Sequence, residues 1–187
     1  MSIIVLPLKG IKKRHEFYLK LGVMLLGYEE LDAACRATIT QLKGYPPELA
    51  LLMALYYKTG CRPVEGVEEN RWSLAIDGSV RLVTAKSGFV RKFNAIELPD
   101  PFYDALESGF WPFPFTRQSG AEYYFQRVFV YPGLVKGGKK VRLYAFRYRY
   151  VKMYHRAGWT DKQIAEKMAW ADIGLVDRYA NAKLYTG

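Results

Sequence analysis

The spacing of apolar residues changes in the middle of the chain, and this change is the strongest constraint on the fold that the chain can adopt. Residues 72–99 alternate between apolar and polar side chains, and the dipeptides Asp77-Gly78 and Ser87-Gly88 interrupt the alternation. Both dipeptides are typical of tight turns between antiparallel strands. The segments on either side instead repeat their apolar residues at helical spacing. The sequence therefore predicts a mainly helical α+β fold with a small three-stranded antiparallel sheet.

Proline, glycine and capping residues place the ends of the helices. Prolines at the start and a glycine at the end mark a helix over residues 45–60. The stretch 144–158 alternates Arg and Tyr, but its length and the final Gly158 favour a helix over a strand. Thr160 opens a capping-box pattern, and Asp172 is a second candidate N-cap. Further helices are expected over residues 28–44, 100–109 and 121–133, with loops over 110–120 and 134–142.

The length of 187 residues fits one domain with a short extension. Half of the residues are hydrophobic, which is enough to bury a core. We expect residues 1–27 to form an N-terminal arm and residues 28–187 to form the folded domain.

Charge and composition narrow the class of partner. The net charge of +10 points to a polyanion, most often nucleic acid, with an anionic membrane surface as the weaker alternative. Two cysteines are too few for a disulfide framework, and two histidines argue against a zinc site. The apolar stretches are too short and too charged to span a membrane, and the N-terminus lacks the order of a signal peptide. We expect a cytoplasmic protein without a metal or other cofactor.

Four short segments carry residues suited to phosphate chemistry. "TGCRPVEG" places Arg62 at an expected helix entrance with Glu65 three residues later, and "TAKSG" places Lys86 beside a turn. "YAFRY" places Tyr144 and Arg147 on one helix face, because residues three apart are neighbours on a helix. The fourth segment, "AWADIGLVDRY", contains Trp170 and Tyr179.

In order and spacing these segments resemble the catalytic domain of tyrosine recombinases, the phage-integrase family. "TGCRPVEG" resembles the first arginine box, and "TAKSGFVRKFNAIELPD" resembles the hairpin that carries a catalytic lysine. "YAFRYRY" resembles the His-x-x-Arg-His box, and "MAWADIGLVDRY" resembles the box that leads into the nucleophilic tyrosine. The resemblance covers residues 28–182. Family members usually carry a core-binding domain before this region, so the sequence is either a catalytic-domain-only recombinase or part of a longer chain.

The resemblance implies a reaction that needs no metal. Attack on a phosphodiester builds negative charge on the non-bridging oxygens, and two guanidinium groups can neutralise it. The resemblance assigns Arg62 and Arg147 to this clamp and Tyr179 to the nucleophile that forms a 3′-phosphotyrosyl bond. It assigns Lys86 to the general acid that protonates the leaving oxygen.

Three further catalytic candidates follow from the resemblance. Glu65 would orient an arginine. Tyr144 and Trp170 stand where many members have histidines, and they would pack on or hydrogen-bond to the phosphate. A phenol cannot shuttle protons near neutral pH as a histidine does. Taken singly, each of these residues has a plainer interpretation as a packed or solvated side chain.

The basic residues outside these segments are candidates for contact with the DNA backbone. Solvated loops are the alternative interpretation. The expected DNA-binding residues are Lys136, Lys139, Lys140, Arg142, Arg149 and Arg91.

The sequence therefore supports one first hypothesis and two alternatives. The first is a site-specific recombinase or integrase that acts on double-stranded DNA and assembles with itself on it, with an accessory DNA-binding protein as a candidate partner. The second is a DNA-binding regulator of recombinase fold whose site is idle. The third and weakest is a topoisomerase that relaxes DNA by similar chemistry.

Overall fold

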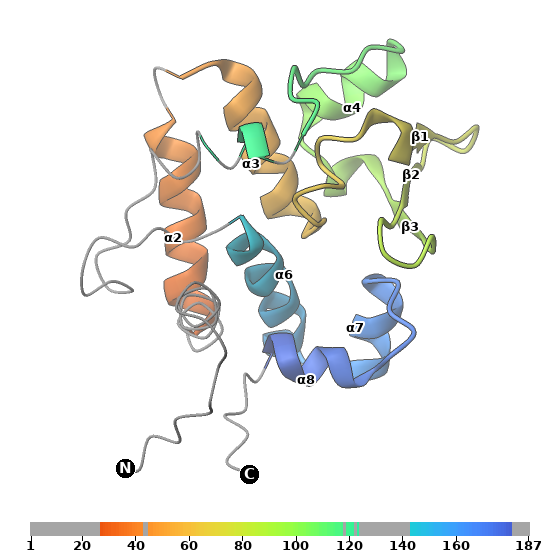
Figure 1. The fold of residues 1–187 in the computed structure, drawn as a ribbon. Coiled ribbons are helices and arrows are strands. Elements are labelled where there is room, and N and C mark those ends of the chain that lie inside the picture. The colour runs from red at the N-terminus through yellow and green to blue at the C-terminus, as the bar shows by residue number, and fades with distance from the viewer. Residues whose placement is uncertain (1–26, 43–44, 118, 122, 124–142, 181–187) are drawn as a thin grey trace, which may run out of the picture.

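The computed structural model describes residues 27–42, 45–117, 119–121, 123 and 143–180. Helices make up most of this part, and one three-stranded sheet lies beside them (Figure 1). The predicted α+β architecture is confirmed. The expected N-terminal arm, the loop 134–142 and most of the helix expected over 121–133 lie outside the described residues.

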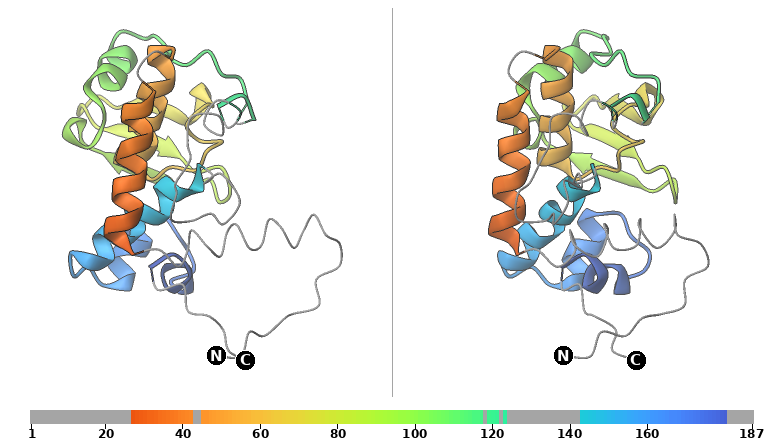
Figure 2. Two further views of the ribbon diagram at one scale, coloured as in Figure 1. Left: turned by 90° about the vertical axis from the view of Figure 1, so that its left-hand side faces the viewer. Right: turned by 60° about the vertical axis from the view of Figure 1, so that its left-hand side comes forward.

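The first two helices are α2 (Tyr28–Gln41) and α3 (Pro47–Thr59), as the sequence predicted. Pro47 stands in the first turn of α3, where a missing N–H removes no helical hydrogen bond. α3 ends at Gly60, whose left-handed φ of 57° lets its N–H donate to the Tyr56 carbonyl. Figure 1 and the right view of Figure 2 show α2 on one side of α3 and the sheet on the other.

The chain after α3 forms a turn, not the helix that was expected at Arg62. The N–H groups of Glu65 and Gly66 both donate to the Arg62 carbonyl, at 2.9 and 3.2 Å. Gly66 lies so close to α3 that a Cβ on it would be 2.3 Å from Cε1 of Tyr56. The turn is therefore packed tightly against α3, with η1 (Glu69–Arg71) after it.

The sheet has the order β1-β2-β3, with β1 (Trp72–Leu74), β2 (Val80–Val83) and β3 (Val90–Phe93). Both pairings are antiparallel, and both predicted hairpin turns are present. In the first turn, the Ser79 N–H donates to Oδ1 of Asp77 at 3.0 Å. The second turn, between β2 and β3, contains Lys86. After β3 follow η2 (Ala95–Glu97) and α4 (Asp100–Glu107).

The Arg- and Tyr-rich stretch forms a helix, α6 (Tyr144–Arg156), and its middle is buried from Ala145 to Lys152. It packs against α2, α3 and α8, which is why it buries residues all round. α7 (Asp161–Lys167) begins with the predicted capping box at Thr160. α8 (Gly174–Ala180) follows the predicted capping residue, because Oδ1 of Asp172 accepts from the Gly174 N–H at 2.9 Å.

Two groups of buried side chains form the core. The larger joins α2, α3, the sheet and the start of α6, and the smaller joins the end of α6 to α7 and α8. Tyr179 packs against both groups. The candidate nucleophile therefore lies where the two parts of the core meet.

Candidate active site

Glu65 is the centre of a hydrogen-bonded cluster, although none of its side chain is exposed. Its Oε1 accepts from Nη1 of Arg62 at 2.7 Å and from the Ala85 N–H at 3.0 Å, and its Oε2 accepts from the Arg62 N–H at 2.6 Å. Burial favours the protonated acid, but Arg147 and these N–H groups outweigh it and hold the pKa of Glu65 below its ordinary value. The carboxylate therefore fixes Arg62 as the sequence suggested, and it also holds the β2–β3 turn.

Arg147 is fully buried at the start of α6. Its Nη1 donates to the Gly60 carbonyl at 2.8 Å and lies 3.9 Å from Oε2 of Glu65. Burial, together with the charges of Arg91 and Arg62, lowers the pKa of Arg147 to about 10. The guanidinium groups of Arg62 and Arg147 thus flank the Glu65 carboxylate, and Arg91 adds a third positive charge that acts on Arg147, which leaves an excess of positive charge suited to an anion.

Three buried donors in this cluster have no hydrogen-bond acceptor in the described part of the chain. They are Nε and Nη2 of Arg147 and Nε1 of Trp170. Cζ of Arg147 lies 5.3 Å from the centre of the Trp170 ring, so the donors belong to one site. Buried donors without an acceptor cost stability, and in native proteins each such group has a reason, for instance a catalytic role or the binding of an ion.

Tyr179 lies directly beside these donors. The centre of its ring is 5.9 Å from Cζ of Arg147 and 4.9 Å from the centre of the Trp170 ring. The Tyr148 ring packs on it as well, at 4.6 Å. The predicted nucleophile is therefore close to the predicted phosphate clamp, and the short helix α8 presents it.

Tyr144 is half-buried at the first position of α6. Burial and the neighbouring Tyr179 raise the pKa of its phenol, and the positive charges of Arg147 and Arg62 only partly offset this. The phenol therefore stays protonated at neutral pH, where it can donate a hydrogen bond but cannot exchange protons as histidine does.

Lys86 is exposed in the β2–β3 turn. The bond from the neighbouring Ala85 N–H to Glu65 ties this turn to the arginine cluster. A second bond, between the hydroxyl groups of Thr84 and Ser87 at 2.9 Å, closes the turn on itself. The structure thus brings together the segments that carry all seven predicted catalytic residues, with Lys86 at the edge of the site.

The predicted DNA-binding residues are divided between buried positions and undescribed ones. Arg149 and Arg91 are only 5% and 2% exposed. Arg149 donates to Oδ1 of Asp32 at 2.6 Å and to the Tyr57 hydroxyl at 2.9 Å, so it joins α6 to α2 and α3. Arg91 points into the core because of the alternation on β3, and Arg149 lies in the buried middle of α6. Either side chain would have to break its hydrogen bonds within the protein to contact DNA. The other four lie outside the described residues: Lys136, Lys139, Lys140 and Arg142.

Two contributors to the site were missed in the sequence. Tyr148 follows Arg147 in the segment "YAFRYRY" and was given no role, but its ring packs on Tyr179. Arg91 was taken for a DNA contact, but it is a buried charge close enough to Arg147 to lower its pKa. Its position in the alternation of β3, between exposed Val90 and Lys92, was the one signal that could have placed it inside.

No group of three or more histidine, cysteine or acidic residues with the geometry of a metal site occurs in the described ranges. Among the same residues, no helix has the length and apolar character needed to cross a membrane.

The fold is similar to the folds of several solved structures. The chain is similar to a lambda integrase dimer bound to a COC′ core site, with a TM-score of 0.64, 18% identity and coverage of 87% of this chain. It is also similar to the XerH site-specific recombinase bound to a palindromic difH substrate in a post-cleavage complex, with a TM-score of 0.54, 16% identity and 85% coverage. The chain has the tyrosine recombinase catalytic-domain fold.

The recombinase fold is shared at low sequence identity and over part of each relative. This chain spans 60% of the lambda integrase chain and 50% of the XerH chain. No protein-family model matches the sequence, and no curated protein matches it. The activity of this chain is therefore argued from its own site.

Proposed function

We propose that this protein is a site-specific DNA recombinase or integrase that cleaves and rejoins strands through a covalent bond between Tyr179 and a 3′ phosphate. One observation carries the proposal. The Tyr179 ring lies 5.9 Å from Cζ of Arg147, which is buried with two N–H groups lacking an acceptor among the described residues. A tyrosine beside unpaired guanidinium donors is the arrangement that attack on a phosphodiester requires.

The reaction conserves the energy of the phosphodiester bond. The Tyr179 oxygen attacks phosphorus and loses its proton to water, while the bond from phosphorus to the 5′ oxygen breaks. The leaving 5′ oxygen takes a proton from the Lys86 ammonium group. Attack of a 5′ hydroxyl on the phosphotyrosine reverses the sequence and releases Tyr179, so no nucleotide cofactor is consumed.

Arg147 and Arg62 neutralise the charge that builds on the non-bridging oxygens, and Trp170 and Tyr144 add neutral donors. The unpaired donors are fully buried beside the aromatic rings of Trp170 and Tyr179. A phosphate therefore reaches them only if these rings move. Tyr179 lies on α8, a short helix of seven residues. A shift of α8 would move the Tyr179 ring, admit the phosphate and bring the Tyr179 hydroxyl to the phosphate.

The partner is double-stranded DNA, in keeping with the net charge of +10. Recombination needs two strand cleavages in each duplex, so several copies assemble on DNA, and an accessory DNA-binding protein is a candidate partner. A protein with this substrate acts inside the cell, where its DNA is.

Tyr144 supports a second candidate function, a DNA-binding regulator whose site no longer cuts. The pKa of its phenol is raised, so proton transfer at this position is lost at neutral pH. The presence of Arg62, Arg147 and Tyr179 around one site, with Lys86 in the turn at its edge, favours the enzyme.

Covalent capture separates the two functions. The protein is incubated with supercoiled plasmids carrying pooled genomic inserts, quenched with detergent and run on a denaturing gel. The enzyme predicts a protein–DNA band that disappears in Tyr179→Phe and Arg147→Lys but persists in Tyr154→Phe. DNA binding by the wild type without any such band, also on plasmids nicked to trap the intermediate, would support the regulator.

A further inference from the structure

Arg91 connects three segments behind the candidate site. Its Nη2 donates to the Thr59 carbonyl at 2.6 Å, at the end of α3. Its Nε donates to the Lys167 carbonyl at 2.9 Å, at the end of α7. Arg91 itself stands on β3, after the turn that holds Lys86. One buried side chain therefore links the hairpin to two helix ends.

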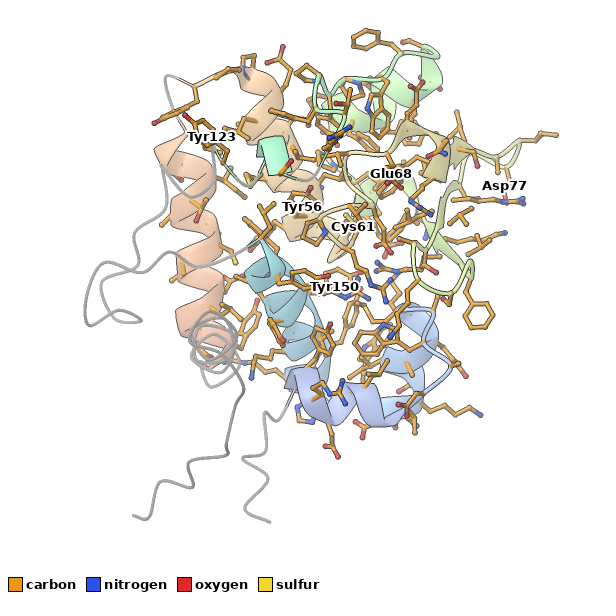
Figure 3. The ribbon with its side chains drawn as sticks, viewed as in Figure 1. Tyr56, Cys61, Glu68, Asp77, Tyr123 and Tyr150 are labelled. Atoms are coloured by element: carbon orange, nitrogen blue, oxygen red, sulfur yellow. The ribbon has the colours of Figure 1, made fainter. Side chains whose placement is uncertain are left out.

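The Thr59 contact leads to Arg147. Thr59 precedes Gly60, whose carbonyl accepts from Nη1 of Arg147 at 2.8 Å. Tyr150 fills the space beside Gly60 so closely that a Cβ there would be 2.5 Å from its Cγ, and Cζ of Arg91 lies 5.6 Å from the centre of the Tyr150 ring. Figure 3 labels Tyr150 and Cys61 in this region, between α3, α6 and the sheet. Any shift of Thr59 is passed on to the acceptor of Arg147.

The Lys167 contact leads to Trp170. The last carbonyls of a helix have no partner within it, and Arg91 supplies one at the end of α7. Two residues later, Ala169 has a left-handed φ of 51°, a conformation that non-glycine residues adopt only where the surroundings hold it. The backbone N–H of Trp170 then donates to the Ala165 carbonyl at 2.8 Å. Arg91 thus braces the bend that aims the Trp170 indole at Arg147.

Arg91 has more charge and more donors than a brace needs. Its Nη1 is buried without an acceptor among the described residues. Its charge acts on Arg147, whereas the Glu65 carboxylate pairs with Arg62 and Arg147. A side chain kept for stability alone would be better replaced by an apolar one, because a buried and partly unpaired charge is costly.

We propose that Arg91 is a positioning residue of the site: through the Thr59 and Lys167 carbonyls it sets Arg147 and Trp170 relative to each other, and its charge strengthens their hold on a phosphate group. This rests on the proposed function in one respect, that the anion is a phosphate. The arrangement of the donors is a claim about the protein without any ligand.

The test follows the Nε–H signal of Arg147 by NMR in full-length protein with isotope-labelled arginine, with Arg147→Lys used to assign it. Inorganic phosphate is then titrated in. In Arg91→Met we expect the Arg147 signal to shift before phosphate is added and phosphate affinity to fall on the order of tenfold, because misplaced donors lose their charge-assisted hydrogen bonds. We expect the thermal midpoint to stay close to that of the wild type, since an unpaired buried donor is removed.

Arg91→Lys separates charge from geometry. It keeps the positive charge but can reach only one of the two carbonyls at a time, so the Arg147 signal should still shift while phosphate affinity falls by less than in Arg91→Met. The matched control is Arg81→Met. Arg81 stands on β2 of the same hairpin, is exposed and faces the other side of the sheet, so its variant should leave both readouts unchanged.

Each outcome decides the proposal. It is overturned if either Arg91 variant keeps the wild-type Arg147 signal and phosphate affinity, or if Arg91→Met only lowers the thermal midpoint. Should Arg91→Met fail to fold, Arg91→Lys gives the answer. Should the wild type not bind phosphate, the proposed function loses its anion site, while the Arg147 signal in the phosphate-free variants still decides whether Arg91 positions Arg147.

Discussion

Arg147 has no exposed surface, yet two of its N–H groups find no acceptor among the described residues. Such a residue lowers the stability of the folded state, but these two donors can bind an anion. The spacing to Tyr144 placed Arg147 on one face of a helix, which is a local property, and the resemblance to tyrosine recombinases implied its role. The sequence could not predict Glu65 as the shared partner of Arg62 and the Ala85 N–H, because that contact joins residues 20 apart.

Replacing Arg147 by methionine should separate stability from function. The variant loses the bond to Gly60 but also removes two unpaired buried donors, each of which costs about 1–3 kcal/mol. We expect the free energy of unfolding to stay within roughly 2 kcal/mol of the wild type or to rise, while phosphate binding and covalent capture are lost. Urea denaturation measures the first quantity, and a fall of more than about 4 kcal/mol would show that Arg147 is mainly structural.

Glu65→Gln should be destabilising in a pH-dependent way. Because the pKa of Glu65 is held below the ordinary value of 4.5, its ionised form adds stability that is fully present above pH 4.5 and is lost as pH falls through the folded-state pKa. We expect a loss of about 3–5 kcal/mol at neutral pH, as for one broken partner of a buried ion pair. The difference from the wild type should shrink in acid.

Glu68→Gln is the matched control for that measurement. Glu68 pairs with Arg71 at the surface, so its removal should cost less than about 1 kcal/mol. Unfolding curves from pH 7 down to about pH 3 compare the two variants with the wild type, across the ordinary range of carboxyl pKa values. A Glu65→Gln deficit that is absent, or that does not change with pH, would contradict the role given to this carboxylate.

At the scale of elements, the capped helix starts and the hairpin turns could be predicted. Asp77-Gly78, Thr160 and Asp172 act through their own neighbours along the chain, so the sequence alone locates them. The turn after α3 was not predictable, because its shape depends on the packing of Gly66 against Tyr56 on another element.

Gly60 joins the end of α3 to the site, and Gly60→Ala should disturb both. The new Cβ would lie 2.5 Å from Cγ of Tyr150, on a backbone whose φ is 57°. We expect a loss of more than about 2–3 kcal/mol from strain and overpacking together. Gly109→Ala has a similar φ of 68° but open space, so it should lose only about 1–2 kcal/mol. Equal urea midpoints for the two variants would contradict the close packing at Gly60.

Arg149 links elements as well, since it joins α6 to Asp32 on α2. Arg149→Met should cost about 3–5 kcal/mol, because it leaves Asp32 buried without its main partner. The double variant Asp32→Asn/Arg149→Met should cost less than the two single losses added together. Additive losses in a double-mutant cycle of unfolding free energies would show that the pair is not coupled across α2 and α6.

For the whole molecule, charge predicted a polyanionic partner but not which cations would face it. Arg91 is turned inward because β3 packs one face against the core, and Arg149 is buried because α6 is covered by α2, α3 and α8, which are properties of the assembled fold. The order of segments carried more information than any one residue. Arg62, Lys86, Arg147 and Tyr179 are separated along the sequence, and the fold gathers their segments around Glu65 and Trp170.

The affinity of the protein for duplex DNA should fall steeply as the salt concentration rises, as expected for contacts to phosphates. Each phosphate contact contributes about 0.9 to the slope of log affinity against log salt concentration. Arg149→Met should leave this slope unchanged, because Arg149 is buried against Asp32 and Tyr57. Fluorescence anisotropy with a labelled duplex at several salt concentrations measures the slope. A slope that is smaller by about 0.9 in Arg149→Met, the value of one phosphate contact, would show that Arg149 contacts DNA.

We expect Tyr179 to be the residue that takes the phosphate. Tyr144 and Tyr148 lie in the same cluster, so covalent capture alone does not identify the nucleophile. The most direct measurement digests the captured complex with nuclease and protease and locates the nucleotide adduct by mass spectrometry. We expect the adduct on the peptide that contains Tyr179 and its absence in Tyr179→Phe. An adduct on Tyr144 or Tyr148, or one that survives in Tyr179→Phe, would contradict this assignment.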